Sequence, residues 1–118
     1  MAKILIVDDS RIMRINLKKI FEELGHSVVA EAGDGNSALE AYEKHMPDLV
    51  TMDITMPGMS GIETVEEMIK RFPDAKIIMV SSHSQKEMVV EAISKGAMHY
   101  ILKPIKHEMI ADMVGRFI

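Results

Sequence analysis

The sequence contains no cysteine and no tryptophan. The absence of cysteine excludes disulfide bonds and thiol chemistry. No apolar run approaches the roughly 20 residues that a membrane-spanning helix needs, and charged residues follow the first apolar run too early for a secretory signal. The net charge of −4, without a basic patch, argues against nucleic-acid binding. We therefore expect a soluble cytoplasmic protein that binds neither membranes nor nucleic acid.

Short apolar runs alternate with longer amphipathic stretches along a chain whose 118 residues fit one domain. The apolar runs predict five strands, at residues 3–7, 27–32, 48–53, 76–81 and 99–102. Helical patterns predict five helices that start at about residues 10, 36, 60, 84 and 107. Alternation of this kind predicts an α/β fold with a parallel sheet covered on both faces. Five units favour a doubly wound, flavodoxin-like sheet with the strand order 2-1-3-4-5.

Local signals add detail to three of the helices. The first helix is indicated by apolar residues near helical spacing, with Gly25 as a stop: Ile12, Ile15, Ile20 and Leu24. Ser60 with Glu63 has the spacing of a capping box at a helix start, and so does Ser84 with Glu87.

Two adjacent aspartates, Asp8 and Asp9, follow the first strand, and Asp53 closes the third. In the order 2-1-3-4-5 these strands are neighbours, so we expect the three carboxylates to converge at one edge of the sheet. At ~4 Å and an effective dielectric of about 20, two like charges repel by roughly 4 kcal/mol. Such a cluster must take up a proton or bind a cation, and oxygen ligands of this kind suit Mg²⁺. An aspartate that only caps the next helix is the alternative, which three strand-end aspartates make less favourable.

Two further polar residues follow strands at the same edge, Ser81 after the fourth and Lys103 after the fifth. A hydroxyl and an ammonium beside a metal–carboxylate cluster are suitable partners for phosphate oxygens. A structural ion pair between Lys103 and Asp53 fits the spacing equally well.

Together, "VDDS", "DITMPGMSG", "VSS" and "KP" at successive strand ends resemble the receiver domain of two-component response regulators. The resemblance covers essentially the whole chain and is strongest to single-domain chemotaxis regulators of the CheY type. It implies that Asp53 accepts a phosphoryl group from the phosphohistidine of a histidine kinase. It also implies that Asp8, Asp9, Asp53 and the backbone carbonyl of Thr55 bind Mg²⁺, for which Mn²⁺ can substitute.

The resemblance assigns roles to four other positions. Ser81 and Lys103 would contact phosphoryl oxygens, and the Lys103–Pro104 peptide bond would be cis. Tyr100 would be an aromatic switch that rotates when Ser81 moves. Thr55 and His83 would tune the lifetime of the phosphoryl group.

The implied output surface is the fourth helix, the fifth strand and the last helix, about residues 84–118. Four methionines fall in this segment, and we expect at least half of them to belong to the core: Met88, Met98, Met109 and Met113. The implied partners are a histidine kinase, a protein output target and a phosphatase, and we expect a monomer.

The resemblance thus implies a single receiver domain, residues 1–118, that works as a phosphorylation-activated switch. It would not be a conventional enzyme, although it would catalyse its own phosphorylation and dephosphorylation. One alternative is the receiver of a longer regulator, such as a transcription factor or a chemotaxis methylesterase.

Two alternatives belong to other classes. An aspartate-nucleophile phosphatase usually has a second aspartate two residues after the nucleophile, where this sequence has Thr55. A flavodoxin-type cofactor binder needs a phosphate-binding loop after the first strand, and "DDSRIMR" is unfavourable for an anionic cofactor.

Overall fold

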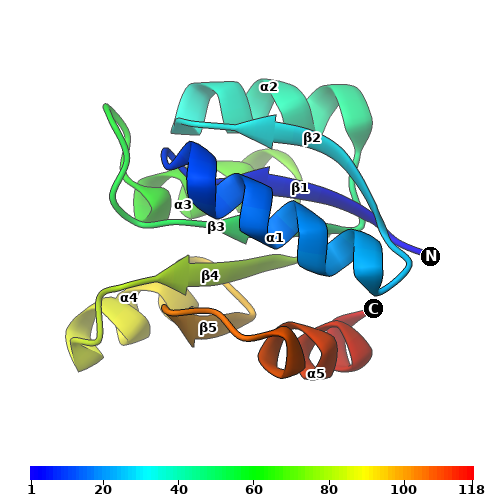
Figure 1. Cartoon of the computed structure of the whole chain (residues 1–118). Coiled ribbons are helices and arrows are strands. Elements are labelled where there is room, and N and C mark those ends of the chain that lie inside the picture. Colours follow the sequence, from blue (N-terminus) through cyan, green and yellow to red (C-terminus); the bar gives the residue numbers. More distant parts are fainter.

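The computed structural model describes residues 1–118 as one parallel sheet with helices on both faces (Figure 1). The five strands are β1 (Lys3–Val7), β2 (Ser27–Ala32), β3 (Leu49–Met52), β4 (Ile77–Ser81) and β5 (His99–Leu102). The five helices are α1 (Arg11–Glu23), α2 (Gly35–His45), α3 (Gly61–Arg71), α4 (Lys86–Lys95) and α5 (His107–Phe117). The strand order is β2-β1-β3-β4-β5, which confirms the predicted topology. None of the helices is both long and apolar enough to cross a membrane.

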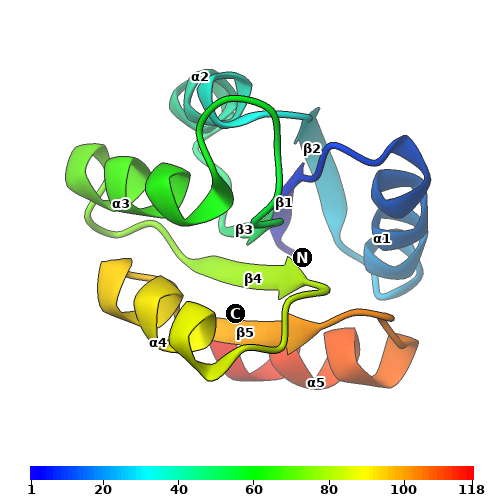
Figure 2. The ribbon, with the colours of Figure 1, turned by 90° about the vertical axis from the view of Figure 1, so that its left-hand side faces the viewer.

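Alternate residues of each central strand face two separate cores. Leu5 and Val7 of β1 pack toward α2, α3 and α4, whereas Ile4 and Ile6 pack toward α1 and α5. Figure 2 shows these two groups of helices on opposite sides of the sheet. Because both faces are covered, every residue of β3 and β4 is buried. This explains why these strands appear in the sequence as continuous apolar runs.

The apolar residues of α1 do not all face the core. Ile12 and Ile15 are 73% and 55% exposed, whereas Leu17 and Phe21 are fully buried. With 3.6 residues per turn, Ile12 and Ile15 lie about 140° and 200° around the helix from Leu17. Ile20, on the edge of the buried stripe, packs partly against the core. The predicted helix is therefore confirmed, and its buried stripe runs through Leu17 and Phe21.

One of the two predicted capping boxes forms. The Glu63 N–H donates to Ser60 Oγ at 3.2 Å, and the Ser60 N–H donates to Glu63 Oε1 at 3.0 Å. The box predicted from Ser84 and Glu87 is absent, since α4 starts one residue after Gln85 with no side-chain cap. The chain before α4 is instead hydrogen-bonded to β4 and β5 through His83.

The two chain ends lie together at the amino-terminal edge of the sheet, on the right in Figure 1. Ala2 and Ile118 line the same hollow there, and the Ala2 N–H donates to His26 Nδ1 at 2.9 Å. Lys76 Nζ donates to the Phe117 carbonyl at 2.9 Å and so holds the end of α5. The opposite edge of the sheet, where the strands end, is free of both termini.

The loop from β3 to α3 ends at a glycine, Gly61, which contacts the backbone at the end of β3. The Gly61 N–H donates to the Ile54 carbonyl at 2.7 Å, and a Cβ atom on Gly61 would overlap the carbonyl oxygen of Asp53. Gly61 is therefore required because backbone meets backbone at this point. This contact fixes the start of α3 directly against the end of β3.

We expect Gly61→Ala to lower the free energy of unfolding by about 1–3 kcal/mol, the usual cost of overpacking. Gly115 in α5 is the matched control, because a Cβ atom there meets nothing within 4 Å. Gly115→Ala should raise stability by roughly 0.5–1 kcal/mol. Urea unfolding curves of both variants test this, and a Gly61→Ala protein as stable as wild type would contradict it.

Candidate functional site

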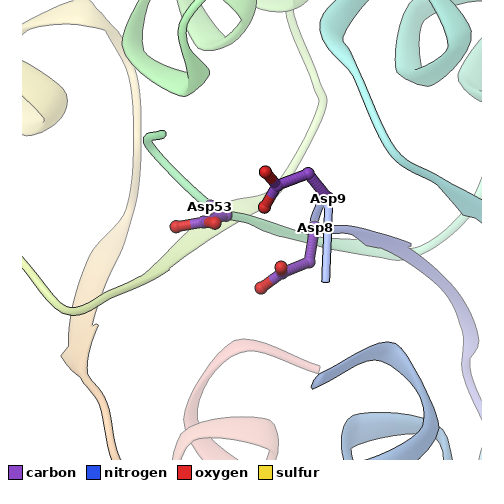
Figure 3. Close-up of side chains that lie close together, drawn as sticks. All are labelled: Asp8, Asp9 and Asp53. Carbon is purple, nitrogen blue, oxygen red and sulfur yellow. The ribbon is translucent and has the colours of Figure 1, made fainter. Parts of the chain in front are cut away.

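Three aspartates meet at the carboxyl-terminal edge of the sheet. Each offers a carboxylate oxygen, and these oxygens all lie within 4.8 Å of one another. Figure 3 shows Asp8, Asp9 and Asp53 gathered around one space at the ends of β1 and β3. The parallel register brings them there, since Val7, the last residue of β1, lies opposite Met52, the last residue of β3, and the aspartates follow directly. The predicted convergence of the three carboxylates is therefore confirmed.

Lys103 lies between two of these carboxylates. Its Nζ donates to Asp8 Oδ2 at 3.0 Å and lies 3.6 Å from Asp53 Oδ2. Backbone N–H groups hold the other oxygens, from Ser10 to Asp8 Oδ1 at 2.9 Å and from Ile54 to Asp53 Oδ1 at 2.8 Å. The ion pair between Lys103 and Asp53, which the sequence analysis gave as an alternative, is thus present. It places the Lys103 ammonium beside the three carboxylates. The Lys103 peptide bond to the following proline is cis, as the resemblance implied.

The electrostatics of Asp53 are unfavourable for its charged form. Burial is the largest cause and raises the pKa of Asp53, and the Asp8 carboxylate raises this pKa further. Lys103 and the Ile54 N–H lower the pKa without cancelling these effects, and Asp9 adds a smaller increase. One lysine therefore does not neutralise the three carboxylates.

The donor set of the cluster fits a hard divalent cation. All three groups are oxygen donors, and Asp9 is exposed, so solvent reaches the site from one side. Thr55, whose carbonyl is the fourth predicted ligand, follows Asp53 by two residues in the β3–α3 loop.

Ser81 is the last residue of β4 and is fully buried at the same edge. Its Oγ accepts a hydrogen bond from the His83 N–H at 3.0 Å and has no hydrogen bond to the three aspartates. Because a hydroxyl also carries one donor hydrogen, Ser81 keeps the capacity to donate to a group placed on the neighbouring strand end.

His83 connects three of the predicted residues to one another. Its Nε2 lies 2.7 Å from Thr55 Oγ1, which joins the β4–α4 loop to the β3–α3 loop. Its carbonyl accepts a hydrogen bond from the Tyr100 hydroxyl at 2.7 Å, and its N–H contacts Ser81. Tyr100 is half-buried against the core on the α2–α4 side. Sequence reasoning placed Thr55 and His83 near the site but did not predict that they bind each other.

Arg14 was missed altogether. It lies in α1, and its Nη1 donates to the Asp8 carbonyl at 2.7 Å while its Nε pairs with Glu31 Oε1 at 3.1 Å. The available signal was an arginine in the second turn of the helix that follows the aspartate pair. That signal is weak, because such an arginine usually points to solvent.

A doubly wound sheet with acidic, hydroxyl and lysine side chains at its strand ends defines a receiver-type signalling domain. The chain belongs to the response regulator receiver domain family, which it matches over residues 4–115. Within this family it is similar to the chemotaxis protein CheY of Thermotoga maritima, with 44% identity over 97% of this chain and 95% of that protein.

Solved structures and longer proteins extend the comparison. The CheX–CheY–BeF3–Mg²⁺ complex of Borrelia burgdorferi contains a chain that matches with a TM-score of 0.94 and 34% identity, covering 98% of this chain and 89% of that chain. The transcriptional regulatory protein DegU of Brevibacillus brevis is 35% identical over 95% of this chain but only 48% of its own length. The family thus includes both short, CheY-type proteins and longer regulators.

We expect the metal-free protein to lose stability as the pH rises through the raised pKa of Asp53. The folded state holds the Asp53 proton more tightly than the unfolded chain, whose aspartate titrates near about 3.9. The stabilising contribution is therefore complete below that value and disappears above the raised pKa. Urea unfolding in EDTA across this range should show Asp53→Asn becoming the more stable protein at neutral pH. Parallel pH profiles for the two proteins would contradict the pKa shift.

Proposed function

We propose that this chain is a phosphorylation-activated switch of the CheY type, with Asp53 as the phosphoacceptor. The observation that supports this best is the position of the Asp53 carboxylate, buried at a strand end beside Lys103 and Asp8. A carboxylate whose position is fixed and whose negative charge is only partly neutralised is suited to accept a phosphoryl group together with a cation.

The reaction requires little from the protein beyond positioning and charge neutralisation. A carboxylate oxygen of Asp53 forms a bond to phosphorus while the bond from phosphorus to the donor imidazole nitrogen breaks. The imidazole keeps that electron pair and takes a proton from water. An ionised carboxylate needs no general base for this step. Bound by Asp8, Asp9, Asp53 and the Thr55 carbonyl, Mg²⁺ would neutralise the cluster and align the phosphoryl oxygens.

Lys103 and Ser81 supply the remaining contacts to the phosphoryl group. The Lys103 ammonium already lies 3.6 Å from Asp53 Oδ2, so an oxygen added there stays within its reach. The Ser81 hydroxyl has a donor hydrogen available for a second oxygen. Thr55 stands where an aspartate-nucleophile phosphatase would have its second aspartate, which disfavours that alternative.

His83 would transmit the change at the phosphorylation site from Ser81 to Tyr100. If Ser81 turns toward a phosphoryl oxygen, its bond to the His83 N–H weakens, and the carbonyl of His83 is the group that holds the Tyr100 hydroxyl. Thr55 and His83 would set how readily this loop moves and how long the phosphoryl group persists. The outcome is a shift between two packings of the β4–α4 loop and Tyr100.

The output surface would be α4, β5 and α5. Large apolar side chains are exposed on these three elements and the loop before β5: Val90, Ile93, Met98, Leu102 and Met109. Met113 is buried and Met88 packs against a core, so half of the four methionines in this segment belong to the interior, as expected. An apolar surface of this kind suits a protein target.

The relatives support a biological role in chemotaxis. The CheY of Thermotoga maritima is a chemotaxis protein, and the Borrelia burgdorferi relative was crystallised with Mg²⁺. We infer a cytoplasmic, monomeric chemotaxis regulator of a single domain, residues 1–118, with a histidine kinase as donor and a phosphatase as a further partner. The longer relative DegU keeps the receiver of a longer regulator, such as a transcription factor or methylesterase, as the alternative.

Incubation with a small acyl-phosphate donor and Mg²⁺ should add one phosphoryl group, seen by intact-protein mass. Asp53→Asn should remove the adduct, and EDTA should suppress it, because the acceptor and the cation are both needed. Mn²⁺ should restore it after EDTA treatment. No adduct on a folded protein that binds Mg²⁺ would show that this cluster is not a phosphoacceptor.

Tyr100→Ala should leave the extent of phosphorylation within about twofold of wild type, because Tyr100 acts after the chemistry. Phosphorylation of this variant should no longer change amide hydrogen exchange in residues 84–118. Tyr42→Phe is the control, since Tyr42 is buried in α2, where it stacks on Phe72. Loss of phosphorylation itself in Tyr100→Ala would contradict the assignment of Tyr100 as a switch.

A further inference from the structure

We propose that Arg14 is a positioning residue of the metal site, which sets the peptide between Asp8 and Asp9 and is itself oriented by Glu31. The inference rests on the proposed function, because it assigns a role in Mg²⁺ binding. Arg14 does not touch the reacting atoms and would act through the backbone.

The geometry of Arg14 is that of a bridge among three elements. From α1, Nη1 donates to the carbonyl of Asp8 at the end of β1, at 2.7 Å. Nε donates to Glu31 Oε1 on the edge strand β2, at 3.1 Å. The Arg14 and Glu31 side chains are 21% and 35% exposed, so the guanidinium is partly shielded from water. Charge-assisted bonds of this type are stronger than bonds between neutral groups.

The carbonyl that Arg14 holds belongs to the peptide that leads into Asp9. The other contacts of this turn all fix Asp8: its N–H donates to the Ala32 carbonyl at 3.0 Å, and its carboxylate is held by Ser10 and Lys103. The Asp9 side chain has no hydrogen bond and is exposed. Its direction therefore depends on the backbone, and Arg14 is the side chain that restrains this peptide.

The charge of Arg14 alone would act the other way. A cation near three carboxylates repels a metal ion, so an unpaired Arg14 would weaken binding. The ion pair with Glu31 reduces this repulsion. The main contribution of Arg14 to Mg²⁺ binding is therefore the orientation of the peptide between Asp8 and Asp9. A lysine could contact the Asp8 carbonyl or Glu31 but not both in the fixed fork that a guanidinium provides.

The test is a calorimetric titration of the metal-free full-length chain with Mg²⁺. Arg14→Ala should weaken binding by about tenfold, as loss of a residue that orients metal ligands typically does. Arg14→Lys and Glu31→Gln should each give a smaller loss. Arg71→Ala should bind as wild type does, because Arg71 forms an exposed ion pair with Glu67 on α3, away from the cluster.

A kinetic readout separates positioning from a general loss of structure. In phosphorylation by a small acyl phosphate, Arg14→Ala should need about ten times more Mg²⁺ for half-maximal rate. Its rate at saturating Mg²⁺ should stay within about twofold of wild type, because the acceptor itself is unchanged. Thermal unfolding in EDTA measures any loss of stability separately, and the other two variants decide the matter if Arg14→Ala does not fold.

Mg²⁺ affinity of Arg14→Ala equal to or tighter than that of Arg71→Ala would overturn the inference, since repulsion or a purely structural role would then be the explanation. Wild-type protein that fails to bind Mg²⁺ would instead overturn the proposed function. The two failures are therefore distinguishable.

Discussion

Mutual repulsion among three carboxylates, held within 4.8 Å by the register of two parallel strands, is the constraint on which the site depends. The core residues of β1 and β3 fix the backbone positions, so the buried Asp8 and Asp53 stay close together. Lys103 and the Ile54 N–H offset part of the cost, yet burial and, after it, the Asp8 carboxylate keep the pKa of Asp53 raised. The fold thus stores unfavourable electrostatic energy that a cation or a proton relieves, and this makes the site responsive.

A short chain of hydrogen bonds connects this responsive site with a distant surface. Ser81 ends β4, His83 lies in the loop that follows, and Tyr100 lies within β5; each bond between them involves the backbone of His83. The side chain of His83 also binds Thr55 in the adjoining loop. The β4–α4 loop is therefore hydrogen-bonded both to the β3–α3 loop and to β5, the strand that carries Tyr100. Such a loop is a suitable two-state element, because its few hydrogen bonds can be exchanged without disturbing either core.

Sequence reasoning succeeded where a local pattern or a general topological rule decides the outcome. The strand order and the meeting of Asp8 and Asp53 follow from strand–helix alternation, and the Ser60 cap depends on residues three apart. It failed where residues distant in sequence compete. The bond of Thr55 to His83 spans 28 positions, and that of Arg14 to Glu31 spans 17, so no local pattern encodes them. The capping box predicted at Ser84 was also wrong, because α4 begins at Lys86.

The two chain ends meet at the edge of the sheet opposite the acidic cluster, where they line one hollow. The chain ends and the acidic cluster are therefore separated by the length of the strands. A short linker could join the ends, and new ends could be opened in a surface loop, without crossing the acidic edge. A fusion at the chain ends, or a linker that joins them in a circularly permuted protein, would therefore leave the acidic cluster accessible.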